Sequence, residues 1–493
     1  MFKKIGVVLL ISTSLLAAPA DIAKVAQPGT SPLVSFRILF TAGSASDPAG
    51  KEGLASLTAG MLAEAGTRTM TYDQIVEAMY PMATSVDWQV DKEMTVFSGT
   101  THVENLDRYY GLFRDMLTDP GFRPEDFTRL RDDAINFLKV SLRESNDEEL
   151  GKEHLYNVIY AGHPYGHHNA GKVSSLAKLT VNDVREFYRA NYTQANLVVG
   201  LAGGYPNGFP EKVAADFVRL PEGSATKKRF NAPRLTPGTH MEFIERDTRS
   251  TAISLGFPID ATRASKDWPA LALVSSYFGQ HRSSNSYLYG RLREARGLNY
   301  GDYAYVEYFP RGMFQMTPDP NLGRQQQIFQ IWIRPVEAEN SLFALRAALY
   351  EYDKLIRQGI SEEAFESTRE FLMKFSNILT QTQSARLGYA LDSRYYGIPD
   401  FNGYMREQLS RLTWKEVNSV IQKYLKSDRM HVVAVTKDGQ TLRNAILKNQ
   451  PSPITYNSAK PKEIMDEDKV IQAYRINVKP EDIVIIPVER VFQ

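Results

Sequence analysis

The chain has 493 residues, more than one hydrophobic core usually serves, which predicts two or more domains. Its 58 basic and 57 acidic residues nearly cancel, so no overall electrostatic field would attract nucleic acid or an anionic membrane surface. Cysteine is absent, which excludes disulfides and any thiolate chemistry.

The N-terminus has the pattern of a secretory signal peptide over residues 1–20. Two lysines precede an apolar run from Ile5 to about Leu16, and the tripeptide APA at 18–20 follows as a cleavage site. The run is too short to cross a bilayer comfortably, and no later stretch is long and apolar enough to do so. We expect a mature chain that begins near Asp21, is exported to the periplasm and has no membrane span.

The first elements of the mature chain are a strand followed by helices. SPLVSFRILFTAG (31–43) alternates apolar and polar side chains and predicts a half-buried strand. Helical periodicity follows in KEGLASLTAGMLAEAGTRT (51–69) and in PEDFTRLRDDAINFLKVSLRES (124–145). A half-polar strand favours an antiparallel or mixed sheet with helices on one face. Because the strand lies close to the predicted cleavage site, we expect the first half to lack a further edge strand.

One pattern occurs twice along the chain. Residues 179–204 and 412–439 both begin with Leu-Thr, in which Thr is a typical helix N-cap, and continue through a helix into a β-branched strand that ends at Gly. Pro, Gly and basic residues at 220–240 indicate a linker. Near the end, DIVIIPVERVF (482–492) predicts a terminal strand that docks on another element. The predicted divisions are a signal peptide (1–20), a first half (21–219), a linker (220–240), a second half (241–449) and a tail (450–493).

Several motifs occur in a characteristic order: a strand, Gly-Leu-Ala opening a helix that ends in Gly-Thr, His-Pro-Tyr-Gly at 163–166, and the two Leu-Thr helices. Across nearly the whole mature chain this order resembles the pitrilysin (insulinase) family of zinc metallopeptidases. The resemblance implies an α+β fold of two homologous halves, each an antiparallel sheet with helices packed on one face, arranged as a clamshell. In that family the first helix carries H-x-x-E-H, whose two His bind zinc and whose Glu is the general base, and a downstream Glu is the third ligand.

The corresponding helix here carries neither ligands nor a base. Ser56 and Gly60 stand at the two His positions and Ala59 at the Glu position, and none can replace imidazole nitrogens that bind zinc at about 2 Å. The downstream Glu is expected near Phe137 or Leu138, which are both apolar. The resemblance therefore implies an erased zinc site in a chain that holds no metal or cofactor. The same small side chains are also explained by close packing of the helix on a neighbour.

The second half contains the segment SNSYLYGRLREARGLNYGDYAYVEYF (284–309), which predicts a short helix that stops at Gly297 and a Tyr-rich strand. It is similar to the family segment in which an Arg, and a Tyr seven residues later, reach the substrate at the zinc; here these are Arg293 and Tyr300. The resemblance implies that Tyr300 donates a hydrogen bond to the oxyanion and that Arg293 holds nearby substrate carbonyls. In isolation the pair would indicate a solvated helix Arg and a core strand Tyr.

A cluster of imidazoles in HPYGHH, formed by His163, His167 and His168, suggests a metal site. However, Pro and Gly predict a turn here, and no carboxylate stands at helical spacing nearby. In the family that the chain resembles, this motif is a loop rather than a ligand set. We therefore expect these histidines to serve a structural loop.

Three hypotheses for function remain. The favoured one is a zinc-less subunit that supplies Arg293 and Tyr300 to a separate H-x-x-E-H subunit, which would bind the zinc and hydrolyse a peptide substrate. On this hypothesis the chain is not a peptidase alone but part of a heteromeric zinc metallopeptidase. The alternative is a non-catalytic peptide-binding or scaffold protein of the same fold. Cleavage by this chain alone is the weakest hypothesis, because its eight His form neither H-x-x-E-H nor H-E-x-x-H anywhere.

Overall fold

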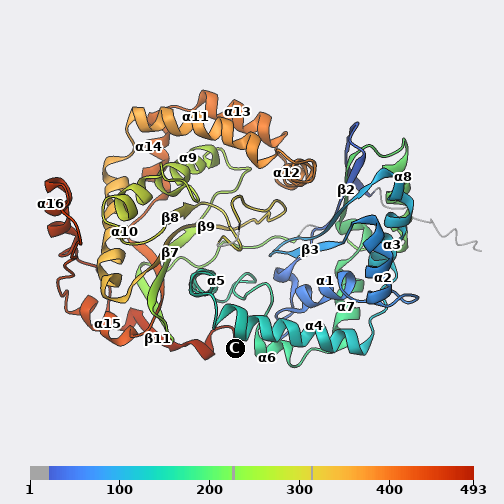
Figure 1. Cartoon of the computed structure of the whole chain (residues 1–493), viewed down its shortest axis with the longest axis horizontal. Helices are drawn as coiled ribbons and strands as arrows, with labels where there is room; N and C mark the ends of the chain where they lie inside the picture. The colour runs from blue at the N-terminus through green and yellow to red at the C-terminus, as the bar shows by residue number, and fades with distance from the viewer. Residues whose placement is uncertain (1–21, 225–227, 313–314) are drawn as a thin grey trace, which may run out of the picture.

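The computed structural model describes residues 22–224, 228–312 and 315–493, and the predicted signal peptide lies outside them. Two halves lie side by side, each built on one β-sheet (Figure 1). The described residues contain no helix long and apolar enough to cross a membrane. The first sheet has the strand order β1, β5, β2, β4, β3, with bounds Ala23–Pro28, Leu197–Gly203, Leu33–Phe40, Thr95–His102 and Asp87–Val90. The second has the order β11, β6, β10, β7, β9, β8, with bounds Ile483–Pro487, Gly238–Glu245, Arg429–Thr436, Ser250–Ile259, Gln327–Glu337 and Asp302–Tyr305.

Both sheets are mixed. In the first sheet the neighbouring strands β5, β2, β4 and β3 pair antiparallel, and in the second sheet so do β10, β7, β9 and β8, as predicted. The outer strands pair parallel: β1 with β5, β6 with β10, and β11 with β6. The predicted α+β fold of two similar halves is confirmed, and the outer strands add a parallel part to each sheet. The reason is connectivity, since the chain returns to β5 and β10 through helices, and helical crossovers permit parallel pairing.

An edge strand that we did not expect opens the first half. Strand β1 alternates half-buried and exposed residues in the sequence AKVAQP, so its apolar pattern is weak. The expectation that the first half lacks a further edge strand is therefore wrong.

In the second half, strand β6 begins at Gly238, within the segment 220–240 that was predicted as a linker.

Apart from α5 and α12, the helices that pack on a sheet cover one face of the sheet of their own half. On this face of the first sheet, Phe36 of β2 packs against Tyr109 and Phe113 of α3. The helices of the first half are α1 to α8: Leu54–Ala63, Tyr72–Met79, Leu106–Thr118, Pro124–Asn136, Asp147–Ile159, Val173–Leu176, Val181–Asn191 and Phe209–Asp216. Those of the second half are α9 to α16: Trp268–Gly279, Ser341–Gln358, Glu362–Leu379, Gln383–Tyr396, Phe401–Arg411, Trp414–Tyr424, Gly439–Leu447 and Lys462–Ile471.

The opposite face of each sheet is covered by a helix from the other half. Helix α5 of the first half packs on β7 and β10, and α12 of the second half packs on β2 and β5 (Figure 1). As a result, Ala252 and Val435 of the second sheet belong to the same hydrophobic core as the first half. On the other side, Gln383 at the start of α12 donates hydrogen bonds to Leu33 O and Ala202 O. The exchange of helices joins the two halves.

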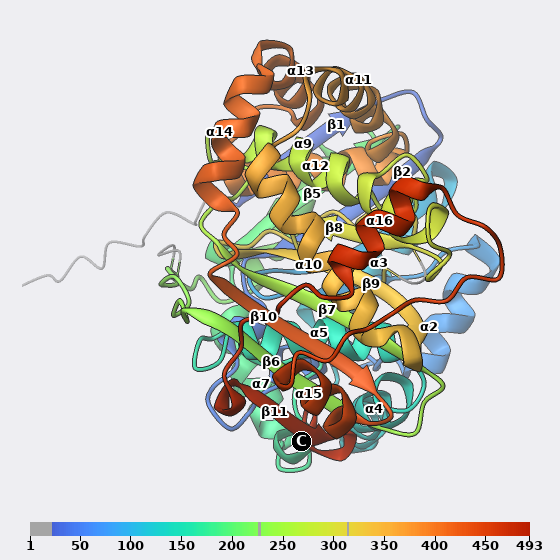
Figure 2. The same cartoon turned by 90° about the vertical axis from the view of Figure 1, so that its left-hand side faces the viewer.

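The C-terminal strap, residues 483–493, forms a second connection. Strand β11 adds to the edge of the second sheet beside β6 (Figure 2), which confirms the predicted terminal strand. The chain then crosses to the first half, where the amides of Val173 and Ser174 donate to Phe492 O and Gln493 O at 2.9 and 3.0 Å. The side chain of Phe492 is buried there. The tail is therefore bound within its own molecule.

The repeated Leu-Thr motif caps one helix in each half. Thr180 accepts from the amide of Asp183 at the start of α7, and Thr413 accepts from Glu416 at the start of α14. In both cases the acidic side chain in turn accepts a hydrogen bond from the Thr amide, which completes a capping box. The predicted N-caps are confirmed, and they start equivalent helices in the two halves.

Candidate functional site

The erased motif lies on α1, which packs between α7, α3, α4 and the edge strand β3. Ala59 is fully buried, so its position has no access to solvent. A Cβ added at Gly60 would lie 3.5 Å from Cζ2 of Trp88, whose indole lies over the position of the second His. The indole Nε1 of Trp88 donates to Glu64 Oε1 at 2.7 Å, which holds the ring in place. A side chain at position 60 would therefore begin in van der Waals contact with this indole.

A cleft of about 1020 Å³ opens beside α1, between the two halves. Ser56 and Gly60 line it, together with Phe137 from the π-helical turn 137–142 that follows α4. Leu138, the other candidate position for the third ligand, is fully buried. Among the described residues, no group of three or more His, Cys, Asp or Glu side chains is arranged to hold a metal ion. The residues at the erased site therefore do not fit zinc.

The three histidines of the HPYGHH loop have separate structural partners. His163 Nε2 lies 2.9 Å from Asn231 O. His167 lies 3.1 Å from Asp47, whose carboxylate accepts from the amides of Gly53 and Ala55 and so caps α1. Burial lowers the pKa of His168 to about 3, which keeps this imidazole neutral near pH 7. The loop supports the start of α1, as a structural loop would.

Arg293 and Tyr300 lie next to each other in the second half. Arg293 belongs to a π-helical turn, and its guanidinium lies 5.3 Å from the ring centroid of Tyr300 and 5.0 Å from that of Tyr289. Gly297, with φ at +70°, ends the turn as predicted. Tyr300 is 77% exposed and precedes β8, so it does not fill the core. Neither Arg293 nor Tyr300 lines the cleft beside α1.

The neighbouring arginines differ from Arg293 in their partners. Arg291 pairs with Glu351 and Glu467, and Arg296 pairs with Glu467 and Asp468 of α16. Arg293 forms no ion pair within the described part of the chain; it only donates to the hydroxyl of Tyr289. Helix α16 of the tail thus holds this turn through Arg291 and Arg296, while the guanidinium of Arg293 remains available for a ligand.

Sequence reasoning missed the acidic residues of α16, because about 170 positions separate them from the arginines and no motif links the two segments. It also missed Asp302, which is fully buried two residues after Tyr300. Asp302 accepts a hydrogen bond from Asn299 Nδ2 at 2.7 Å, and burial raises its pKa to about 8. An Asp in a Tyr-rich strand gives no signal in the sequence that it will be buried.

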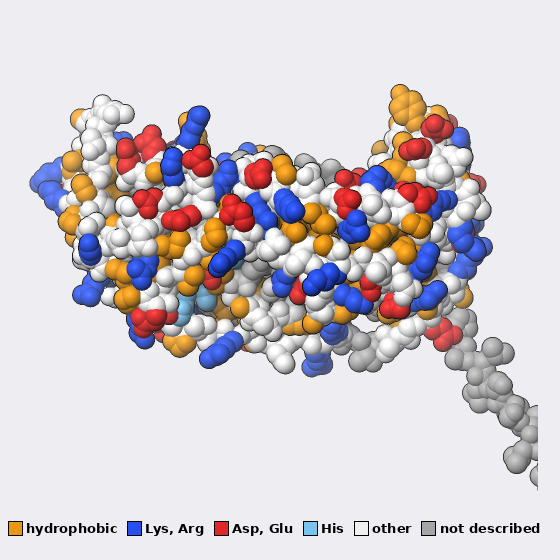
Figure 3. Space-filling view, turned by 90° about the horizontal axis from the view of Figure 1, so that it is seen from below, with side chains coloured by type: hydrophobic (Ala, Val, Ile, Leu, Met, Phe, Trp, Pro, Cys, Tyr) orange, Lys and Arg blue, Asp and Glu red, His pale blue; other side chains and the backbone are white. Residues whose placement is uncertain are grey.

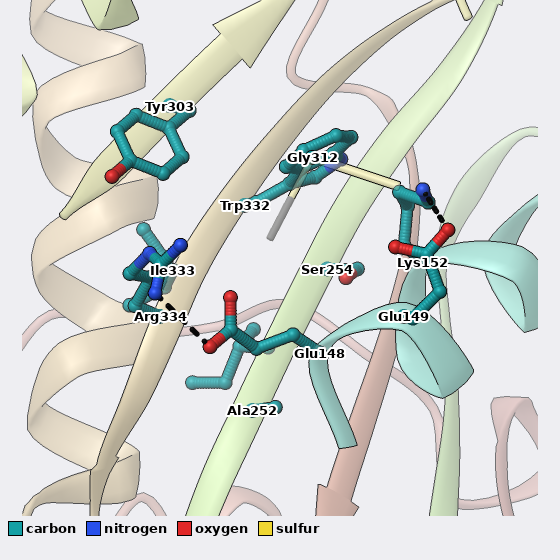
Figure 4. A pocket seen from close by; sticks show the side chains of 11 residues that line it. Glu148, Glu149, Lys152, Ala252, Ser254, Tyr303, Gly312, Trp332, Ile333 and Arg334 are labelled. Atoms are coloured by element: carbon teal, nitrogen blue, oxygen red, sulfur yellow. Dashed lines mark hydrogen bonds and ion pairs between the residues drawn. The ribbon is translucent and has the colours of Figure 1, made fainter. Parts of the chain in front are cut away.

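The N-terminal turn of α5 meets the second sheet at a small pocket (Figure 4). Glu148 pairs with Arg334 of β9 at 3.4 Å, and Lys152 pairs with Glu149. The remaining space is only about 10 Å³, which is less than a ligand requires. These charged side chains therefore join the exchanged helix to the second sheet and do not form a binding site.

Basic and acidic side chains are interspersed over the face of the molecule seen from below (Figure 3). This arrangement matches the near-neutral net charge of the chain. This face therefore lacks the extended basic surface of a nucleic-acid site.

Three features define a zinc-less peptidase-like protein. The fold consists of two α+β halves that exchange helices, α1 carries no zinc ligands at Ser56, Ala59 and Gly60, and Arg293 and Tyr300 form an exposed pair. The sequence profile described as "Insulinase (Peptidase family M16)" matches residues 24–172, and the profile "Peptidase M16 inactive domain" matches residues 178–372. The chain belongs to the insulinase (M16) family, as a member of its inactive, non-zinc-binding type.

Some relatives in this family are named as zinc proteases and others as non-peptidase homologues. An "Uncharacterized zinc protease" of Rickettsia felis is 23% identical over 285 residues, which cover 57% of this chain and 66% of that protein. The "Non-peptidase homolog YmxG" of Helicobacter pylori is 20% identical over 400 residues, covering 80% and 86%. In a solved structure of a peptidase M16 inactive domain from Pseudomonas fluorescens, the fold matches with a TM-score of 0.75 at 22% identity, covering 85% and 96%.

Proposed function

We propose that this chain is the zinc-less subunit of a two-subunit peptidase and contributes Arg293 and Tyr300 to the active site of an H-x-x-E-H partner. One observation carries the proposal. The turn holds a single arginine without a carboxylate partner among the described residues, and that arginine stacks on a Tyr that is 77% exposed. Since no ligand set lies on its own α1, the pair would serve a zinc centre in another chain.

The chemistry of the pair follows from its geometry. The exposed phenol of Tyr300 has no hydrogen-bond partner among the described residues, so its O–H is available to donate to an oxyanion forming on a scissile carbonyl. The guanidinium of Arg293 retains donors beyond the one bonded to Tyr289, and these would hold neighbouring peptide carbonyls. When bound in the partner, zinc supplies the activation of the attacking water.

The position of the pair favours contact with a second chain. Tyr300 lies two residues before β8, the outermost strand of the second sheet, and one edge of this strand is unpaired among the described strands. The proposal includes export to the periplasm, supported by the secretory pattern of the first twenty residues.

A second candidate is a non-catalytic peptide-binding protein. The cleft of about 1020 Å³ beside α1 favours it, because this space persists without the zinc motif. An extended peptide bound there would need neither Arg293 nor Tyr300.

Co-purification separates the two candidates. The tagged mature chain is isolated from its own cells, and proteins present in stoichiometric amount are identified by mass spectrometry. A partner with H-x-x-E-H is the expected result. If the chain emerges alone or only with itself, the shared active site is contradicted and peptide binding in the cleft becomes the favoured function.

A further inference from the structure

Asn299 anchors the segment that carries Tyr300 to strand β9. Its Nδ2 donates to Asp302 Oδ1 at 2.7 Å and to Arg334 O at 3.2 Å, and these two bonds use both of its hydrogens. The amide of Arg334 in turn donates to Gly301 O at 3.1 Å. The backbone on either side of Tyr300 is therefore fixed, although Tyr300 itself is 77% exposed.

Two buried oxygens at this anchor, Asn299 Oδ1 and Asp302 Oδ2, have no hydrogen-bond partner among the described residues. Both atoms are shielded from solvent, so their missing bonds are costly. Exchanging the oxygen and nitrogen of the Asn299 amide would not supply a donor, because its Nδ2 already faces two acceptors. Each of the two oxygens is an acceptor, and one hydrogen between them would satisfy both.

The charge state of Asp302 supplies that hydrogen. Burial raises the pKa of this carboxyl group to about 8, so it holds a proton at pH 7. The nearby cations, Arg334 of β9 and Arg293 of the π-helical turn, favour the charged form but make no ion pair with it within the described part of the chain. Arg334 pairs with Glu148 of α5. An ionised Asp302 would therefore be a buried charge without a hydrogen-bonded counter-charge.

We propose that Asp302 donates its proton to Asn299 Oδ1, which closes a cyclic pair between a carboxylic acid and an amide. The neutral pair holds residues 299–302 and, with them, the backbone of Tyr300. Because the pair carries no charge, it leaves Arg293 without a carboxylate partner and available to a ligand. Asp302 is thus a positioning residue for Tyr300 and Arg293, and this role rests on the function proposed above.

Infrared spectroscopy of the isolated chain tests the pair without a partner protein. In a chain with isotope-labelled aspartate carboxyl groups, a protonated carboxyl group gives a C=O band apart from the bands of ionised carboxylates. At pH 7 we expect such a band, which Asp302→Asn removes and Asn299→Leu moves to the frequency of an acid without a hydrogen-bond acceptor. Asp247→Asn is the control, because Asp247 is 93% exposed, and it should leave the band in place.

Two results would overturn the pair: no protonated carboxyl band that depends on Asp302, or a band that stays unchanged when Asn299 is replaced. Asn299→Ala takes the place of Asn299→Leu if the latter does not fold, as judged by circular dichroism.

Turnover of the complex tests the positioning role. Asp302→Asn keeps an N–H donor at every pH, whereas Asp302 loses its proton as pH rises through about 8. The ratio of kcat for Asp302→Asn to kcat for the unmodified complex should therefore rise about fivefold to tenfold between pH 7 and pH 9. A flat ratio with an intact infrared band would show that the pair does not position Tyr300. Absence of an H-x-x-E-H partner would contradict the proposed function and this role with it, whereas the infrared result on the isolated chain would still decide for or against the pair.

Discussion

Arg324 of the second half donates hydrogen bonds to both carboxylate oxygens of Asp91 in the first half, and the two side chains are 1% and 0% exposed. The arginine also lies 3.7 Å from the ring centroid of Tyr308. Asp91 occupies the turn between β3 and β4. The pair therefore connects the two halves in the buried interior, where water cannot replace a missing partner.

Removal of this carboxylate is expected to destabilise the chain strongly. Asp91→Asn leaves Arg324 buried without a counter-charge, which should lower the free energy of unfolding by about 3 to 5 kcal/mol in urea denaturation. Glu370→Gln is the matched control, because its pair with Lys374 is exposed on both sides and should leave the midpoint unchanged. Similar midpoints for both variants would show that the buried pair does not hold the halves.

Deletion of residues 491–493 should loosen the first half at one defined place. The amides of Val173 and Ser174 lose their acceptors Phe492 O and Gln493 O, so their hydrogen exchange should accelerate at least tenfold in mass spectrometry. Amides of α13, which the strap does not touch, are the internal control. Unchanged protection at both positions would mean that the strap is not bound to the first half in solution.

The buried Asp302 predicts a specific pH dependence. Its pKa is about 8 in the folded chain against an ordinary 3.8, so between these values the folded state holds a proton that the unfolded state releases. Its contribution to the free energy of unfolding therefore falls as pH rises through this window, by up to about 1.4 kcal/mol per pH unit. Asp302→Asn has no such proton and should gain stability relative to the unmodified chain from pH 5 to pH 8. A pH-independent difference between the two would contradict the assigned pKa.

Tyr300→Phe tests the proposed role of the phenol. In the complex with an H-x-x-E-H partner, loss of the donor to the oxyanion should lower kcat more than tenfold while the zinc content of the complex stays the same. Tyr80→Phe is the control, since Tyr80 is 84% exposed and lies in the first half. Equal turnover of the two variants would remove Tyr300 from the mechanism.

Metal analysis of the purified chain should find far less than one zinc per molecule, because Ser56, Ala59 and Gly60 offer no ligand. Restoring His, Glu and His at these positions should still not yield stoichiometric zinc, because Phe137 and Leu138 supply no third ligand. Stoichiometric zinc in the unmodified chain would contradict both functions proposed for it.

Local features of the fold follow from the sequence. The apolar periodicity predicts the central strands and long helices, and the Thr residues mark equivalent caps at Thr180 and Thr413. The spacing of Arg293 and Tyr300 around Gly297 was also visible, because helix ends and turns depend on neighbouring residues. The loss of the zinc ligands is likewise a property of residue identity alone.

Only the tertiary structure shows which distant groups meet. The exchange of α5 and α12, the indole of Trp88 over Gly60, and the support of Arg291 and Arg296 by α16 all join segments without a shared pattern. Such contacts depend on how whole layers pack, and many sequences with the same periodicity would pack differently. The sequence by itself determined most of the elements and the missing ligands, whereas the packing of α16 on the second half decided that Arg291 and Arg296 are paired while Arg293 has no carboxylate partner among the described residues.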